Sequence, residues 1–212
     1  FPIMKIIDIS PVISEKTAVW PGDHAFSREI SRSIDGGDNY TLSSIHTTVH
    51  VGAHTDAPSH YLKGGAAISE VSLESYIGHC QVLEINIEKN SRILISDLTE
   101  EIKAPRVLFK TNSDVDKNTF TEDFNALSVE LVKYLHECAV KLIGIDTPSV
   151  DLFDCEDLLA HNQIAQSNMA ILEGVDLQNV KAGLYDLVAL PLKIAHCDAS
   201  PVRAVLLSPS SA

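Results

Sequence analysis

Short runs of β-branched and aliphatic residues recur along the chain and predict the strands of a sheet. The runs lie at residues 5–9, 44–51, 81–87, 106–111, 141–146, 185–192 and 202–207. Pro191 falls inside the sixth run. Because proline cannot donate a ladder hydrogen bond, we expect that strand to end there or to lie at an edge. The pattern does not order the strands within the sheet.

One segment, residues 128–139, has the apolar spacing of an amphipathic helix. Ser128 suits the N-cap, and Glu130 suits the positive end of the helix dipole. The apolar stripe consists of Leu131, Val132, Leu135 and Ala139. Weaker patterns at 155–165 and 72–77 predict two further short helices. Strands outnumber helices, so the sequence predicts an α/β fold with a mixed sheet and a few flanking helices.

The length of 212 residues suits one domain spanning 1–212. We interpret residues 1–3 as a remnant ahead of a native start at Met4, and we expect 208–212 to form a loose tail. No window approaches the roughly 20 apolar residues that span a bilayer. The N-terminus lacks a basic segment leading into an apolar run, which favours a cytoplasmic location.

The charge of the chain argues against two classes of partner. Lys and Arg number 16 against 29 Asp and Glu, which gives a net charge of -13. Without a basic stripe, such a surface disfavours nucleic acid and anionic membranes. The four cysteines form no C-x-x-C pair, so we interpret them as free thiols in a reducing compartment. A nucleophilic cysteine is the less favoured alternative.

The stretch HVGAHTDAPSH, residues 50–60, carries the clearest candidate chemistry. Its threonines and valines favour an extended chain, on which alternate residues share a face. His50, His54 and Asp56 therefore converge on one point, and Gly52 leaves space between the two imidazoles. Two imidazoles and a carboxylate suit zinc or manganese. The alternative is a surface turn in which some of the nine histidines cluster by chance.

Two further sets of residues could complete such a site. His60 follows a turn at Pro58 and could act as a general base or acid beside a metal-bound water. His161 and Glu173 lie farther along the chain and could add ligands. Their spacing alone leaves a helix-surface histidine and a solvent-facing glutamate equally open.

Residues 50–60 resemble the H-x-G-T-H-x-D-x-P-x-H signature of the cyclase superfamily, metal-dependent hydrolases that include bacterial kynurenine formamidases. Segments similar to others of that family follow its order along most of the chain, at 8–26, 142–151, 158–177 and 185–207. Three positions depart from the family pattern. Ala53 replaces a threonine, Asn162 stands where a second histidine is common, and Ala199 replaces a glycine.

The resemblance implies a swivelling β/β/α-like fold, a homodimer and a site for two divalent metals, zinc or alternatively manganese. It implies the ligands His50, His54, Asp56, His161 and Glu173. It also implies proton transfer by His60 and a substrate pocket lined by Trp20.

The implied reaction is hydrolysis of N-formyl-L-kynurenine to L-kynurenine and formate in tryptophan degradation, by attack of metal-bound hydroxide on the formyl amide. Asp56 and Glu173 would bridge the two metals, since a carboxylate has two oxygens to share. The alternatives are hydrolysis of another amide, such as the cyclic amide isatin, and a non-catalytic metal-binding protein. The sequence contains no G-x-S-x-G nucleophile elbow, which argues against a serine hydrolase.

Overall fold

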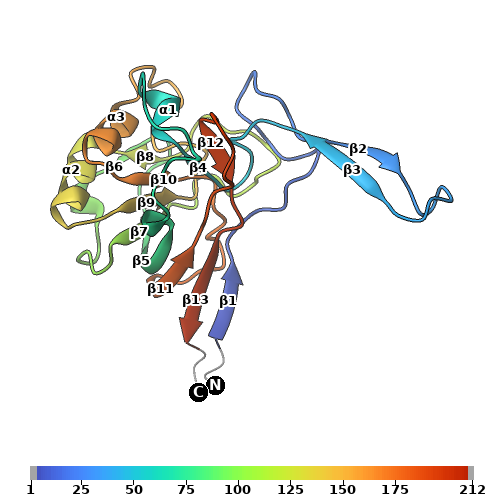
Figure 1. Cartoon of the computed structure of the whole chain (residues 1–212). Coiled ribbons are helices and arrows are strands. Elements are labelled where there is room, and N and C mark those ends of the chain that lie inside the picture. The colour runs from blue at the N-terminus through green and yellow to red at the C-terminus, as the bar shows by residue number, and fades with distance from the viewer. Residues whose placement is uncertain (1–3, 210–212) are drawn as a thin grey trace.

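The computed structural model describes residues 4–209, which fold around a seven-stranded mixed sheet (Figure 1). In spatial order its strands are β1 (Met4–Asp8), β13 (Val205–Pro209), β11 (Gly183–Val188), β5 (Ile77–Glu84), β7 (Arg106–Lys110), β9 (Leu142–Ile145) and β10 (Ala170–Leu172). The last four run parallel, and the first three pair antiparallel up to β5. The expected mixed α/β architecture is confirmed.

Apolar side chains cover both faces of the parallel half of the sheet, as parallel strands require. Every residue of β7 and β9 is buried. On one face Phe109 packs with Leu131 of α2 (Val129–Glu137) and Ile164 of α3 (Leu159–Gln166). On the other face Leu108 and Tyr76 belong to a second apolar cluster. These two apolar clusters hold the strands of the parallel half in place, and the residues of the site follow the ends of those strands.

The predicted helices are present but differ at their ends. The Ser128 side chain accepts a hydrogen bond from the Leu131 amide at 3.1 Å and caps α2 as expected. Ala139 is not part of the buried stripe, because α2 ends at Glu137 and Ala139 is exposed with a positive φ of 62°. The segment 155–165 becomes helical only at Leu159, and the segment 72–77 forms a 3-10 turn, η1 (Leu73–Tyr76).

The strand predicted at 44–51 is present only as far as His46. Up to that residue the chain forms β3 (Leu42–His46), which pairs with β2 (Ser27–Arg32) in a hairpin that projects from the body (Figure 1). After β3 the chain turns at 49–53 and continues as β4 (His54–Asp56). The strand predicted at 185–192 ends before Pro191, because β11 stops at Val188.

Short elements attach the remaining chain to the main sheet. They are α1 (Pro58–Tyr61), β12 (Ala199–Pro201) paired with β4, β6 (Arg92–Ile93) paired with β8 (Ala126–Leu127), and η2 (Ile95–Asp97). Residues 208 and 209 belong to β13, not to a loose tail. Residues 1–3 and 210–212 lie outside the described part. No helix within 4–209 is long and apolar enough to cross a membrane.

We predict that Ser128→Ala lowers the free energy of unfolding by about 1 kcal/mol, because the Leu131 amide loses its capping acceptor. Urea unfolding followed by circular dichroism measures the change. Ser128→Asp is the matched control, since its carboxylate can accept the same hydrogen bond and should keep most of the stability. Equal losses in both variants would contradict a capping role.

Candidate metal centre

The two histidines of residues 50–60 meet across a tight turn and not along a continuous strand. Gly52 lies in this turn with φ +62°, a conformation that L side chains rarely adopt. A Cβ there would also approach Cγ1 of Ile13 to 3.1 Å. His50 therefore precedes the turn and His54 follows it. Both imidazoles approach Asp56 as expected, but a turn brings them together and not the extended chain that the sequence predicted.

His54 and Asp56 belong to β4, whose three residues are all buried. The Nδ1 atom of His54 donates to the Gly52 carbonyl at 2.9 Å, which fixes the ring. Its Nε2 atom then lies 3.1 Å from Oε2 of Glu173 and 3.7 Å from Oδ1 of Asp56. The same Asp56 oxygen lies 3.1 Å from Nδ1 of His50. Both rings thus direct a nitrogen toward one buried carboxylate.

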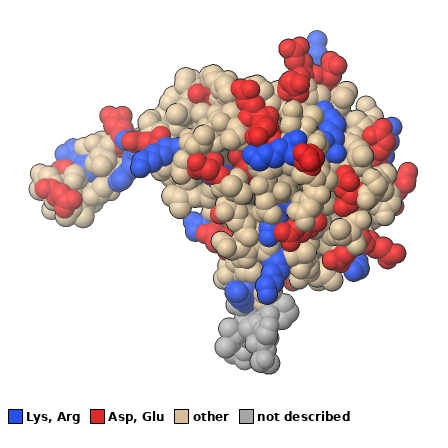
Figure 2. Space-filling model, turned by 180° about the vertical axis from the view of Figure 1, so that it is seen from behind, with Lys and Arg blue, Asp and Glu red and all other residues tan. Residues whose placement is uncertain are grey.

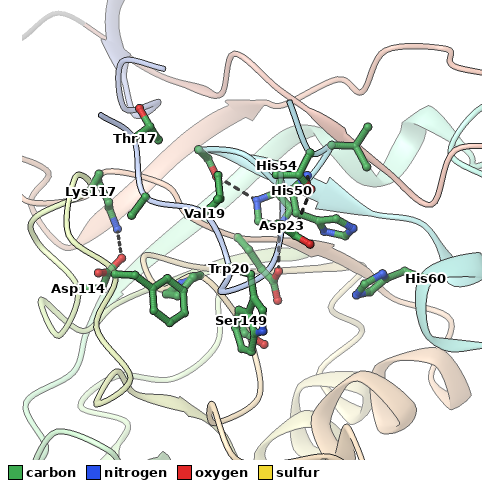
Figure 3. A pocket seen from close by; sticks show the side chains of 18 of the residues that line it. Thr17, Val19, Trp20, Asp23, His50, His54, His60, Asp114, Lys117 and Ser149 are labelled. Carbon is green, nitrogen blue, oxygen red and sulfur yellow. Dashed lines mark hydrogen bonds and ion pairs between the residues drawn. The ribbon is translucent and has the colours of Figure 1, made fainter. Parts of the chain in front are cut away.

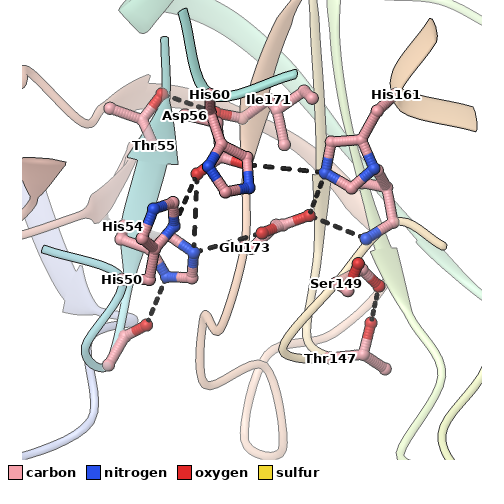
Figure 4. Close-up of polar contacts among 12 residues, drawn as sticks. His50, His54, Thr55, Asp56, His60, Thr147, Ser149, His161, Ile171 and Glu173 are labelled. Carbon is pink, nitrogen blue, oxygen red and sulfur yellow. Dashed lines mark hydrogen bonds and ion pairs between the residues drawn. The ribbon is translucent and has the colours of Figure 1, made fainter. Parts of the chain in front are cut away.

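His161 approaches the same carboxylate from α3 (Figure 4). Its Nε2 atom lies 3.5 Å from Oδ2 of Asp56 and 3.6 Å from Oε1 of Glu173. Its Nδ1 atom is held by Asp151 at 2.9 Å, and Arg92 also contacts Asp151 at 2.9 Å. A carboxylate behind a histidine fixes which ring nitrogen faces the ligand. Sequence reasoning missed Asp151, although it lies in the family-like segment 142–151.

A backbone bridge joins the two distant parts of the site. The His54 amide donates to the Glu173 carbonyl at 3.1 Å, and the Glu173 amide donates to the His54 carbonyl at 2.9 Å. Gly174 makes this approach possible, because a side chain there would collide with the Gly52 carbonyl. Oε1 of Glu173 also accepts from the Val150 amide at 2.7 Å. Sequence spacing alone left the roles of His161 and Glu173 open. In the structure both lie in one cluster with His50, His54 and Asp56.

The buried Asp56 carboxylate tests whether a divalent cation fits this site. Asp56 is 2% exposed, and within the described chain neither of its oxygens has a hydrogen-bond donor. A buried carboxylate is costly unless positive charge lies beside it, so Asp56 requires either protonated imidazoles or a metal cation as its neighbours. Imidazole nitrogens and carboxylate oxygens are the donors that zinc and manganese take in proteins. The residues present therefore fit a metal.

Without metal, protons on the histidines compensate the buried carboxylates. Burial lowers the pKa of His50, but the Asp56 and Asp198 carboxylates outweigh it and raise the pKa to about 9. Burial also lowers the pKa of His161, but the Asp151 and Asp56 carboxylates outweigh this effect and raise the pKa to about 10. Burial raises the pKa of Asp56, and the neighbouring imidazoles more than reverse this and hold it well below its usual value. A metal and these protons compete for the same nitrogens.

A cavity of about 600 Å³ opens beside the cluster and is large enough for a small organic molecule (Figure 3). Trp20 lines it and is half-buried. Its ring contacts Phe120 and Phe153, with centroids 5.4 and 5.1 Å away. One wall of the cavity is therefore aromatic, and the opposite wall carries the candidate ligands.

His60 lies at the mouth of the cavity on α1, next to a carboxylate that sequence reasoning missed. Oδ2 of Asp198 lies 3.4 Å from Nδ1 of His60 and 2.9 Å from Nε2 of His50. The side chain of His60 is 34% exposed, unlike that of His54 or His161. Asp198 lies in the family-like segment 185–207, but nothing in its spacing connects it to a histidine far earlier in the chain.

The chain belongs to the cyclase family, because the family model described as putative cyclase matches residues 7–152, more than half of the chain. It is similar to the structure of a potential metal-dependent hydrolase with cyclase activity, with a TM-score of 0.84 and 27% identity over 99% of this chain and 100% of that one.

Two further solved structures share this fold. A predicted metal-dependent hydrolase from Bacillus stearothermophilus has a TM-score of 0.81 and 27% identity over 97% of this chain and 98% of that one. An isatin hydrolase bound to the product analogue thioisatinate has a TM-score of 0.81 over 98% of this chain and 93% of that one. Its identity of 19% makes it a likeness of fold alone.

We predict that metal-free protein loses thermal stability as pH rises from 7 to 9.5. The folded-state pKa values of His50 and His161 lie above the unfolded value of 6.5, so their contribution is complete below 6.5 and is lost as they deprotonate. Melting curves of metal-free and zinc-loaded protein measure this. The zinc-loaded protein is the control for general charge repulsion and should show the smaller slope. Equal slopes would contradict proton compensation at these histidines.

Proposed function

We propose that this protein is a metal-dependent hydrolase that converts N-formyl-L-kynurenine to L-kynurenine and formate in tryptophan degradation. The observation that carries the proposal is a buried carboxylate, that of Asp56, with nitrogens of three imidazoles 3.1 to 3.7 Å from its oxygens, at the wall of a cavity large enough for a small organic molecule. Similarity to two structures described as metal-dependent hydrolases at 27% identity supports the reaction class. The substrate rests on the resemblance and on the aromatic wall.

Two divalent ions, zinc or alternatively manganese, fit the division of the donor atoms. Oδ1 of Asp56 lies toward His50 and His54, whereas Oδ2 lies toward His161. Glu173 is divided in the same way, with Oε2 toward His54 and Oε1 toward His161. Both carboxylates can therefore bridge two positions. A divalent ion, when bound, lowers the pKa of water and polarises a carbonyl.

We assign to His60 the proton transfer that amide hydrolysis requires, because its side chain lines the cavity beside the candidate ligands. With Nδ1 directed at Asp198, the Nε2 atom of His60 is left to take a proton from the attacking water and to deliver it to the leaving nitrogen. This nitrogen must be protonated before it leaves, because the aniline anion is a poor leaving group and the neutral aniline is a good one. The Trp20 ring offers a flat surface for the aromatic ring of the substrate.

Hydrolysis of a cyclic amide such as isatin is the second candidate. It is supported by the isatin hydrolase with the same fold and by an aromatic wall that suits any arylamide. A non-catalytic metal-binding role is less well supported, since His60 is exposed to the cavity beside the donors.

We further propose that the protein works in the cytoplasm. All four cysteines are free in the structure, and Cys80 is buried. Burial raises the pKa of the Cys80 thiol to about 12, so it is protonated and inert at neutral pH. Free thiols suit a reducing compartment.

We predict that the zinc- or manganese-loaded protein hydrolyses N-formyl-L-kynurenine and that thorough chelation abolishes turnover until metal is restored. Absorbance at the kynurenine band measures the rate, and isatin is assayed in parallel. Faster turnover of isatin than of formylkynurenine would favour the second candidate. Turnover of neither amide by metal-loaded protein would contradict the hydrolase assignment, and activity that survives chelation would contradict the metal.

We predict that His60→Ala keeps the bound metal and lowers kcat by about 100- to 10,000-fold, because only the proton-transfer group is removed. Metal content by mass spectrometry is measured beside the rate. His136→Ala, an exposed histidine at the end of α2, is the matched control and should keep both. Loss of metal from His60→Ala would make His60 a ligand, as its position between Asp198 and His50 allows.

We predict that Asp198→Asn lowers kcat more than it raises KM, because the neutral amide no longer holds Nδ1–H of His60 toward it. Steady-state kinetics separate the two constants. In the His60→Ala background the same substitution should have a smaller effect, limited to what Asp198 contributes through His50, whose Nε2 atom lies 2.9 Å from it. Full additivity of the two losses would contradict this coupling.

A further inference from the structure

The cavity beside the candidate metal centre is lined by more acidic than basic residues. Lys117 is the only lysine or arginine among the residues that line it, whereas five lining residues carry a carboxylate. The five are Asp23, Asp114, Asp116, Glu173 and Asp198. An excess of one sign of charge in a cavity favours ligands of the opposite sign.

Three of these carboxylates already have a partner that carries or can carry a positive charge. The Lys117 ammonium donates to Asp114 at 2.8 Å and also to the carbonyl of Asp146. Its side chain is only 15% exposed, so a carboxylate on a ligand would have to displace Asp114 to reach it. Asp198 and Glu173 contact histidines of the candidate metal centre. The single cation of the cavity wall is therefore not free to bind an anion.

The other two carboxylates, those of Asp23 and Asp116, accept hydrogen bonds from neutral groups. Asp23 accepts from the Thr48 hydroxyl at 3.1 Å. Asp116 accepts from the Asn118 amide at 3.0 Å and from the Thr119 hydroxyl at 2.8 Å, and these two bonds lower its pKa. Within the described part of the chain neither carboxylate forms an ion pair. The cavity therefore contains two negative charges without a positive partner.

These two residues lie on either side of the aromatic wall. Asp23 closes the turn that carries Trp20, because its amide donates to the Trp20 carbonyl at 2.9 Å (Figure 3). Asp116 belongs to the loop that carries Phe120, whose ring lies 5.4 Å from that of Trp20. An ammonium group is attracted both by carboxylates and by the faces of aromatic rings. The wall opposite the candidate ligands thus suits an alkylammonium group.

We propose that this cavity selects arylformamides whose side chain ends in an ammonium group and carries no carboxylate, and that Asp23 and Asp116 recognise the ammonium. The inference rests on the proposed arylformamide hydrolysis for its reaction and adds the charge of the preferred substrate. N-formyl-L-kynurenine carries an ammonium and a carboxylate, so the wall attracts one group and repels the other. N-formylkynuramine, the same arylformamide without the carboxylate, meets only the attraction.

The reaction on this second substrate is the same hydrolysis. The hydroxyl of water joins the formyl carbon, the bond between that carbon and the aryl nitrogen breaks, and the nitrogen takes the remaining proton of the water. The formic acid that forms loses its proton to solvent. The products are formate and kynuramine, and no oxidant or further reactant is needed.

Binding of the product amines tests the charge preference without any turnover. Kynuramine carries an ammonium, L-kynurenine carries both charges, and ortho-aminoacetophenone shares their arylamine ketone but carries neither. Trp20 is the only tryptophan and lines the cavity, so quenching of its fluorescence in zinc-loaded protein measures each Kd. We expect kynuramine to bind about five- to tenfold more tightly than the other two amines. Salt at about 0.5 M should reduce this difference, because exposed charges are screened.

Asp23→Asn with Asp116→Asn should bring the Kd of kynuramine to within about twofold of that of ortho-aminoacetophenone, whose own Kd should not change. Glu29→Gln with Asp35→Asn is the matched control, because it removes the same charge from the exposed hairpin of β2 and β3, outside the cavity. Figure 2 shows acidic residues on the body and on the hairpin of this chain of net charge -13. The control therefore separates the cavity carboxylates from the general field of the molecule, and it should keep the wild-type preference.

L-kynurenine that binds as tightly as kynuramine to wild-type protein overturns the proposal, and so does a preference that survives in Asp23→Asn with Asp116→Asn. The wild-type comparison and its salt dependence decide the matter even where that variant fails to fold. Rates on the two formylated compounds separate this proposal from the proposed function. Preferential binding of kynuramine without hydrolysis of either compound contradicts the reaction alone, whereas a higher kcat/KM for N-formyl-L-kynurenine than for N-formylkynuramine contradicts the charge preference alone.

Discussion

The pair of backbone hydrogen bonds between His54 and Glu173 is the constraint on which the site depends. His54 is the first residue of β4, and Glu173 follows β10 at the edge of the parallel half of the sheet. Neither segment could place its side chain against the other without that bridge, and the bridge in turn requires glycine at 174. The bridge thus brings together two candidate metal ligands, His54 and Glu173, that lie more than a hundred residues apart in the sequence.

This construction also explains how so many charged groups are buried together. Asp56 and Glu173 are each 2% exposed. Their negative charges are balanced by the imidazoles of His50 and His161, whose raised pKa values keep them protonated at neutral pH in the absence of metal. Hydrogen bonds to Asp151 and the Gly52 carbonyl hold the outer ring nitrogens of His161 and His54. The inner nitrogens are therefore oriented before any cation binds, so little side-chain entropy remains to be lost on binding.

Sequence reasoning predicted the strands of the core better than the segments outside it. Continuous apolar runs such as 106–111 and 141–146 mark buried strands because both faces are covered. The hairpin of β2 and β3 was predicted only at residues 44–46, because its strands are exposed throughout and carry no buried apolar face. The convergence of His50 with His54 was predicted from an extended chain, although a turn at Gly52 produces it. Asp151 and Asp198 could not be found, since their partners are close only after folding.

The division between sheet and loops has a consequence for substrate choice. The donor atoms rest on β4, α3 and the end of β10, whereas the cavity wall opposite them comes from the loops around Trp20 and Lys117. These loops are joined by a hydrogen bond from the Ala18 amide to the Lys117 carbonyl at 2.9 Å, and Lys117 is paired with Asp114 at 2.8 Å. A scaffold of this kind can keep its fold and its candidate ligands while the loops of the opposite wall change. We therefore expect the choice between the two proposed substrates, formylkynurenine and isatin, to depend on this loop pair.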